Sequence, residues 1–236
     1  MANMALEILK SSLSFLTTIP AGGDIENLRR NLWVIPFVGL FMGLLISFPS
    51  FFGFWFLCLV LYVIIEGINH IDGLADFGDA LFAPKEKKIA AMKDVNVGAG
   101  GVTILCLYFI TLYYSIQRVG PMDIVMSQIF AKFSMLLLLT TSKPAWDGLG
   151  AYMMQFAGKK DLVIGSIPLF LSFLKPFTLI PLALSTAITF LIRKYSEKNF
   201  GGINGDVIGA CNCMTFATTL LICSLETDIS PFVLIH

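Results

Sequence analysis

Residues 51–79 read FFGFWFLCLVLYVIIEGINHIDGLADFGD, an apolar run followed at once by three aspartates. Asp72, Asp76 and Asp79 stand at i, i+4 and i+7, so on a helix they align in one narrow stripe. Like charges at this spacing repel each other, and no lysine is interleaved to relieve the repulsion. A hard divalent cation such as Mg²⁺ or Mn²⁺ would relieve it. The stripe predicts a metal site at the end of a membrane span, with a solvated face beside the membrane as the simpler alternative.

The composition on either side of this stretch is that of a lipid-embedded protein. Of the 236 residues 56% are hydrophobic and 14% are charged, and the mean hydropathy is +0.81. A soluble domain is roughly 45–50% apolar and about 25% charged. The formal net charge of zero gives no basis for binding nucleic acid. The length predicts a single transmembrane catalytic domain over residues 1–236, with the lipid bilayer as its surroundings.

The apolar segments predict an all-α, polytopic integral membrane bundle with about seven transmembrane helices. The pair around Lys175 and Pro176 is short, and is either a tight hairpin or one broken unit. The first 19 residues, which include Glu7 and Lys10, predict an amphipathic interfacial helix ended by Pro20. Apolar residues among the charges of 85–93 predict a cytoplasmic helical segment. The expected spans are residues 32–48, 51–69, 101–117, 122–141, 162–174, 176–192 and 207–225.

The positive charges predict how the chain is oriented in the cell membrane, because cytoplasmic loops are enriched in lysine and arginine. If every span crosses, only Arg118 and Lys175 fall on the outer side. Loops 70–100, 143–160 and 193–206 then share the cytoplasmic face, which places the active site there. The basic residues on that face are Arg29, Arg30, Lys85, Lys87, Lys88, Lys93, Lys143, Lys159, Lys160, Arg193, Lys194 and Lys198.

Further candidates follow the stripe on the same face. Lys93 is expected to contact a phosphate, and its neighbour Asp94 is expected to be a fourth metal ligand. Asn96 is counted among the phosphate contacts. The glycines at 98, 100 and 101 open the next span, where free backbone N–H groups can hold an anion. Lys143 is expected to hold phosphate as well.

Three more positions carry chemistry with open alternatives. Lys132 lies inside an apolar span, so it either contacts phosphate through a cavity or an internal anion, or snorkels to an interface. Before the last span stand Asn204, Gly205 and Asp206, which are expected to line the site; Asp206 is either an N-cap or a metal ligand. His70 is either structural, a group supporting the metal ligands, or a general base.

The residues closely resemble the cobalamin synthase family (adenosylcobinamide-GDP ribazoletransferase, or cobalamin-5′-phosphate synthase), in order and over nearly the whole chain. The specific likeness is His70-Ile-Asp72-Gly-Leu-Ala-Asp76-Phe-Gly-Asp79 followed by Met92-Lys-Asp-Val-Asn-Val-Gly-Ala-Gly100. Weaker matches are Phe15-Leu-Thr-Thr-Ile-Pro20, Pro36-Phe-Val-Gly-Leu-Phe-Met-Gly43, Gly148-Leu-Gly150 and Gly205-Asp-Val-Ile-Gly-Ala210. The family commonly has arginine at the position of Lys132, glycine at that of Ala80, and carboxylates or amides at those of Cys213 and Phe216.

The resemblance implies an enzyme of cobalamin nucleotide loop assembly. It would join adenosylcobinamide-GDP to α-ribazole or its 5′-phosphate, release GMP and require Mg²⁺. Asp72, Asp76, Asp79 and Asp94 would hold the metal, and spacing does not decide which aspartate acts as base. The alternatives are a CDP-alcohol phosphotransferase of phospholipid synthesis and an ion-coupled transporter. The oligomeric state is open, and a homo-oligomer is compatible with the sequence.

Overall fold

The computed structural model describes residues 2–233, and the side chains of residues 4–226. Every regular element in this range is a helix, which confirms the all-α prediction. The α-helices are α1 (Ala2–Leu16), α2 (Ile25–Arg29), α3 (Ile35–Ser47), α4 (Trp55–Glu66), α5 (Asn69–Phe82), α6 (Lys88–Met92), α7 (Ala99–Ile116), α8 (Pro121–Thr141), α9 (Leu149–Met154), α10 (Lys159–Gly165), α11 (Leu179–Phe200) and α12 (Gly205–Val233). The 3₁₀ helices are η1 (Leu32–Val34), η2 (Phe48–Phe52), η3 (Lys85–Lys87), η4 (Ile167–Leu174) and η5 (Pro176–Thr178).

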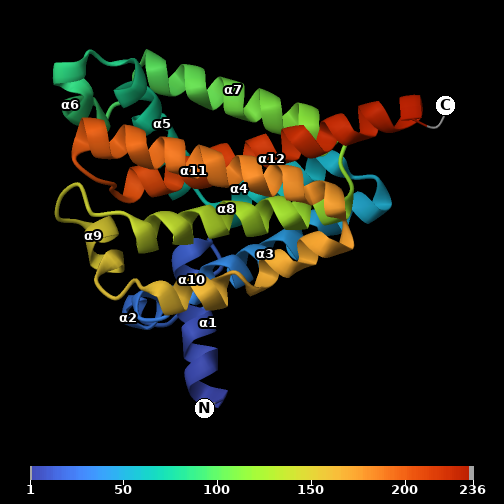
Figure 1. Ribbon diagram of the computed structural model, residues 1–236, viewed down its shortest axis with the longest axis horizontal. Helices are drawn as coiled ribbons and strands as arrows, with labels where there is room; N and C mark the ends of the chain where they lie inside the picture. Colours follow the sequence, from blue (N-terminus) through green and yellow to red (C-terminus); the bar gives the residue numbers. More distant parts are fainter. Residues whose placement is uncertain (1, 234–236) are drawn as a thin grey trace.

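Within the described range, five helical segments are long and apolar enough to cross a membrane, and the bent pair α4–α5 would make six. The predicted count of seven is therefore not confirmed, although the membrane class is. The segment expected at 162–174 consists of the short helix α10 followed by the 3₁₀ helix η4. The chain reverses direction between η4 and α11 (Figure 1), as in the hairpin alternative. The five segments are 32–52, 99–116, 121–141, 176–200 and 205–226.

The centre of the bundle is α8, which is mostly buried and packs closely on α3. Glycines on α3 make this approach possible. A Cβ atom at Gly39 would lie 2.7 Å from the carbonyl oxygen of Gln128, and one at Gly43 would lie 2.7 Å from the Cα atom of Val125. Small residues four apart allow helix backbones to meet in membranes. At these two glycines, α3 therefore approaches α8 too closely for a side chain to fit between the helices.

The chain bends by 88° between α4 and α5. The bend is at Gly67, whose φ of +74° is a conformation that side chains rarely adopt. Thr18, which follows α1, holds the end of α4 in place. Its backbone N–H donates to the carbonyl of Ile65 at 2.9 Å and its hydroxyl to that of Ile64 at 2.7 Å. The aspartate-bearing helix α5 therefore leaves the direction of the preceding span before its first aspartate.

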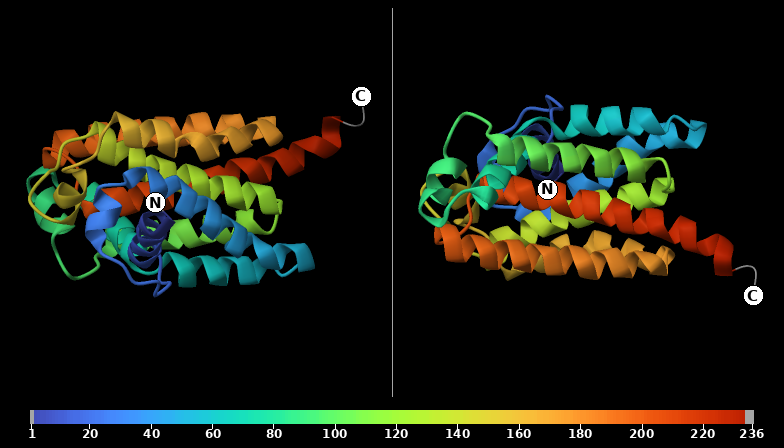
Figure 2. Two further views of the ribbon diagram at one scale, coloured as in Figure 1. Left: turned by 90° about the horizontal axis from the view of Figure 1, so that it is seen from below. Right: turned by 90° about the horizontal axis from the view of Figure 1, so that it is seen from above.

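The three predicted loops lie at one end of the bundle, on the left in Figure 1, where α6, α9 and the turn between α11 and α12 gather. We call this the lysine-rich end. Two of the loops pair directly: the N–H of Ile203 donates to the carbonyl of Lys143 at 2.9 Å, and the N–H of Ala145 donates to the carbonyl of Ile203 at 2.8 Å. Figure 2 shows α1 end-on while the long helices run across the view, so α1 projects from the side of the bundle. This is the orientation expected of an interfacial helix.

Candidate active site

Helix α5 is pressed between α12 and α7, and its two glycines allow this contact. A Cβ atom at Gly73 would lie 2.8 Å from the Cα atom of Asp206, and one at Gly78 would lie 3.1 Å from the carbonyl oxygen of Gly100. The aspartate stripe of α5 thereby meets the starts of two other helices at the lysine-rich end. Asp72 is exposed, whereas Asp76 and Asp79 are half-buried.

Five carboxylates form one acidic cluster, which we define as Asp72, Asp76, Asp79, Asp94 and Asp206. The other four all lie close enough to Asp76 to repel its negative charge. The four predicted metal ligands therefore lie near one another and near Asp206, and their binding of a metal stays a prediction. Among the described residues, no three His, Cys, Asp or Glu side chains form a ready-made set of metal ligands. Mg²⁺ does not need such a set, because it commonly binds one or two carboxylates together with waters and substrate phosphates. The cluster fits that mode.

Asp79 also has a structural task. Its two oxygens accept hydrogen bonds from the N–H groups of Gly98, at 2.7 Å, and Gly101, at 2.8 Å, at the start of α7. The prediction that these glycines hold an anion is correct, but the anion is the carboxylate of Asp79 and not a free phosphate. Each oxygen retains a lone pair, so a metal contact of Asp79 stays a prediction.

The two readings of Asp206 are separated by its neighbour Asn204. The N–H of Val207 donates to the side-chain oxygen of Asn204 at 3.0 Å, so Asn204 is the N-cap of α12 and the N-cap reading of Asp206 is wrong. The amide nitrogen of Asn204 donates to the carboxylate of Asp206 at 2.6 Å. Gly205 lies between them in the sequence, and a Cβ atom at Gly150 would lie 3.1 Å from its backbone nitrogen. Asp206 is thus oriented toward the cluster by the cap.

We expect Asn204→Ala to lower the free energy of unfolding by about 1 kcal/mol, the usual cost of losing an N-cap. Asn204→Ser keeps a capping oxygen but loses the donor to Asp206, so it should retain stability while still lowering activity. Thermal unfolding in detergent and a turnover assay on both variants measure the two effects. Equal activity of Asn204→Ser and the unchanged protein would contradict the orienting role.

The remaining predicted phosphate contacts lie in the loops at the lysine-rich end. The ammonium of Lys93 stands 4.4 Å from the ring centre of Trp146, which joins the loop after α6 to the loop after α8. Asp94 accepts two bonds from Asn96, from its backbone N–H and its amide, each at 3.0 Å. These bonds, the backbone one first, lower the pKa of Asp94 and keep it ionised. Lys143 is exposed. Phosphate binding by Lys93, Asn96 and Lys143 stays a prediction.

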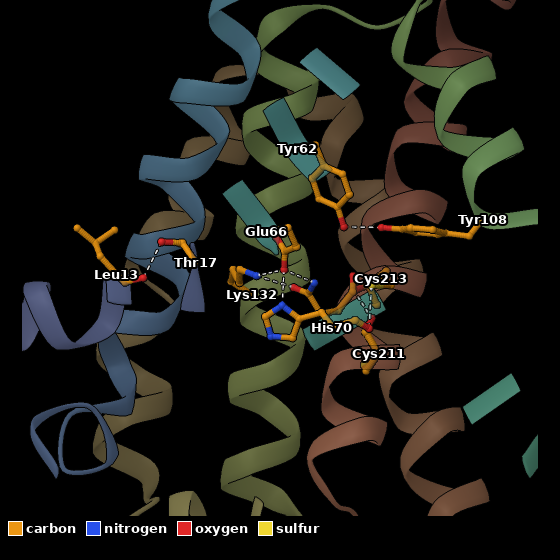
Figure 3. Close-up of polar contacts among 11 residues, drawn as sticks. Leu13, Thr17, Tyr62, Glu66, His70, Tyr108, Lys132, Cys211 and Cys213 are labelled. Carbon is orange, nitrogen blue, oxygen red and sulfur yellow. Dashed lines mark hydrogen bonds and ion pairs between the residues drawn. The ribbon is translucent and has the colours of Figure 1, made fainter. Parts of the chain in front are cut away.

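Lys132 is paired with an internal anion, the carboxylate of Glu66 (Figure 3). The residue is 0% exposed, so the snorkelling alternative is wrong. Its ammonium lies 2.5 Å from Oε1 of Glu66 and 3.1 Å from the side-chain oxygen of Asn212. The amide of Asn212 donates to the same Glu66 oxygen at 2.8 Å. Contact with a phosphate stays a prediction.

Glu66 was missed by sequence reasoning, and it also fixes His70. The Nδ1 atom of His70, one helical turn further on, lies 2.6 Å from Oε1 of Glu66. This contact turns Nδ1 toward Glu66 and leaves Nε2 as the ring nitrogen that a substrate could reach. That second nitrogen points away from Glu66 in Figure 3. The signal available in the sequence was a lone glutamate in an apolar run, four residues before His70.

A cavity of about 190 Å³ adjoins the acidic cluster. Its polar lining comes from the starts of α5 and α12, which touch: a Cβ atom at Gly209 would lie 3.0 Å from the Cα atom of His70. Its apolar lining comes mainly from α1, α3, α8 and α9. The lining residues are Phe15, Leu16, Ile35, Asn69, His70, Met135, Leu139, Leu149, Gly150, Met153, Gly205, Asp206 and Ile208.

Apolar helices long enough to span a bilayer, a buried ion pair in their midst and five carboxylates gathered at one end define a polytopic membrane protein with an acidic site. A family model described as cobalamin-5-phosphate synthase matches residues 8–224. The chain belongs to this family, as its motifs predicted.

Relatives match along almost their whole length. Two proteins of Archaeoglobus fulgidus, both named adenosylcobinamide-GDP ribazoletransferase, are 59% and 50% identical to the chain. The alignments cover 95% of this chain and 100% of the first relative, and 91% and 96% for the second. A protein of Thermococcus kodakarensis with the same name is 35% identical, over 92% of this chain and 98% of its own. No solved structure matches the chain.

Proposed function

We propose that this protein is an adenosylcobinamide-GDP ribazoletransferase of cobalamin nucleotide loop assembly. The observation that carries the proposal is the 59% identity, over 95% of the chain, to a relative of that name. A ribose hydroxyl of α-ribazole, or of its 5′-phosphate, attacks the phosphorus attached to cobinamide. A new P–O bond forms, the P–O bond of the diphosphate bridge breaks, the hydroxyl loses its proton to a base, and GMP leaves. Family membership leaves the CDP-alcohol and transporter alternatives without support.

The residues divide this work as follows. Asp72, Asp76, Asp79 and Asp94 would supply the one or two carboxylates that hold Mg²⁺, which when bound would neutralise charge on the diphosphate oxygens. Asp206 joins these candidates because it belongs to the same cluster. Asp79 ties α5 to the start of α7 through Gly98 and Gly101. Transfers of this kind depend on positioning and charge stabilisation, which is the task that these helix starts fit.

The other predicted groups bind and orient the substrates. Lys93 and Lys143, in neighbouring loops of the lysine-rich end, would hold the phosphates. His70, with Nδ1 facing Glu66, would offer Nε2 to the attacking hydroxyl. The excess of Lys and Arg at this end supports a site on the cytoplasmic face of the cell membrane.

GMP release tests both the activity and the metal. Purified protein in lipid nanodiscs should release GMP from adenosylcobinamide-GDP only when α-ribazole or its 5′-phosphate is present, with one corrinoid product formed for each GMP. Removing divalent ions with EDTA should abolish release and Mg²⁺ should restore it, whereas the larger Ca²⁺ should restore it poorly. GMP release that is independent of the nucleoside would contradict the transfer, and full activity in EDTA would contradict the metal.

A further inference from the structure

The cavity beside the acidic cluster has walls of two kinds. Phe15, Ile35, Met135 and Met153 are among its apolar residues, and these come from four different helices. The polar residues come from the adjoining starts of α5 and α12. Asp206 belongs both to the cavity lining and to the acidic cluster. A molecule bound here would therefore have an apolar body among α1, α3, α8 and α9, with a polar end facing the acidic cluster.

The volume limits which part of a substrate can enter. An apolar cavity of about 150 Å³ in another protein takes up benzene, whereas sites that enclose drug-sized ligands measure about 300–1,000 Å³. At about 190 Å³, this cavity holds one small ring system. A corrinoid or a whole nucleoside diphosphate is too large. The occupant is a fragment of a substrate, and the rest of that substrate lies outside.

The wall chemistry separates the two heterocycles of the reaction. Guanine carries hydrogen-bonding groups along most of its edge, and each one buried without a partner costs about 1–3 kcal/mol. The apolar helices that form most of the lining supply no such partners. The benzimidazole of α-ribazole is a flat and mainly apolar bicycle, and its polar ribose is attached at one point. That division matches the two kinds of wall.

We infer that this cavity is the subsite for the acceptor nucleoside, with the benzimidazole among Met135, Met153 and Ile35 and the ribose directed to His70 and Asp206. The inference rests on the proposed function and names the place of one substrate within it. The attacking hydroxyl then stands between the cavity and the acidic cluster, on the side from which the diphosphate is reached.

Filling the cavity tests the assignment. Met153→Trp should raise the KM for α-ribazole about 10-fold or more, because a pocket responds by 10–200-fold to a misfit of one methylene group. The KM for adenosylcobinamide-GDP should not change. The matched control is Met214→Trp, since Met214 lines a separate apolar hollow between α5, α7 and α12. This control should leave both KM values unchanged.

Enlarging the cavity gives a test that does not depend on tolerance of a larger side chain. Met153→Ala should raise kcat/KM for the riboside of a tricyclic naphthimidazole, relative to that for α-ribazole, by about 10-fold. Unchanged preference in Met153→Ala, or an equal rise of both KM values in Met153→Trp, would overturn the subsite. Failure of the unchanged protein to release GMP would instead overturn the proposed function, so the two failures are distinguishable.

Discussion

Asp76→Asn is expected to lower the rate of GMP release by about 10²–10³-fold, the usual cost of removing one electrostatic stabiliser from an active site. Asp76 stands in the middle of the aspartate stripe, and the other four members of the acidic cluster act on its charge. The substitution keeps the size of the side chain and removes the charge that would attract Mg²⁺. The measurement is GMP release with both substrates over a range of Mg²⁺ concentrations. A weaker metal site should show as a higher Mg²⁺ requirement.

The matched control is Asp147→Asn, an exposed aspartate in a loop of the same end. It removes one negative charge from the same region and should leave GMP release within about twofold. Asp147→Asn should unfold at nearly the same temperature as the unchanged protein, because an exposed charge contributes little stability. Asp76→Asn should unfold at the same or a higher temperature, because it removes a charge that four neighbouring carboxylates repel. Full activity of Asp76→Asn at every Mg²⁺ concentration would remove this residue from the metal site.

Lys132→Met is expected to destabilise the protein by about 3–5 kcal/mol, because it leaves the buried carboxylate of Glu66 without its ammonium partner. Both side chains are fully buried and their charged atoms lie 2.5 Å apart. For a chain of this size each kcal/mol shifts the unfolding temperature by about 2–4 °C, so a fall of roughly 6–20 °C is expected. Thermal unfolding in detergent measures the fall. Lys160→Met, at an exposed position, is the control and should shift the temperature by less than about 2 °C.

The double variant Glu66→Gln with Lys132→Met separates pairing from function. It removes both charges, so it should recover much of the stability lost in Lys132→Met. Because Glu66 also contacts His70, only one outcome is decisive for Lys132: near-normal turnover in a stable double variant would exclude its predicted phosphate contact. A single Lys132→Met variant as stable as the unchanged protein would contradict the importance of the ion pair.

The aspartate stripe and its shared end could be predicted because both follow from local rules. Helical spacing aligns Asp72, Asp76 and Asp79, and the distribution of Lys and Arg places the loops on one face. The partner of Lys132 could not be named in the same way. The sequence shows that this lysine needs an anion, but which of the apolar helices supplies it depends on how they pack, and Glu66 and Asn212 come from two different ones.

Two predictions named an interaction but not the group that makes it. Free N–H groups at the start of α7 are visible in the glycines around Gly98, yet the anion that occupies them comes from Asp79, 19 residues earlier in the chain. For α12, the sequence left Asp206 open as either the N-cap or a metal ligand, whereas the side-chain oxygen of Asn204 accepts from the N–H of Val207. The helix count differs at two places: η4 is a 3₁₀ helix, which hydropathy alone does not distinguish from a span, and α4 has only 12 residues before the chain bends into α5.

The bend at Gly67 has a consequence for how the protein is inserted into its membrane. Helix α4 is almost entirely apolar, and the three aspartates of α5 come only after the change of direction. If α5 continued straight from α4, three carboxylates would enter the membrane along the axis of the apolar span. Gly67, in the left-handed conformation, redirects the chain after α4, whose end is held by the hydrogen bond from Thr18 to Ile64. The apolar helix and the charged helix therefore follow one another in the sequence but take different directions in the membrane.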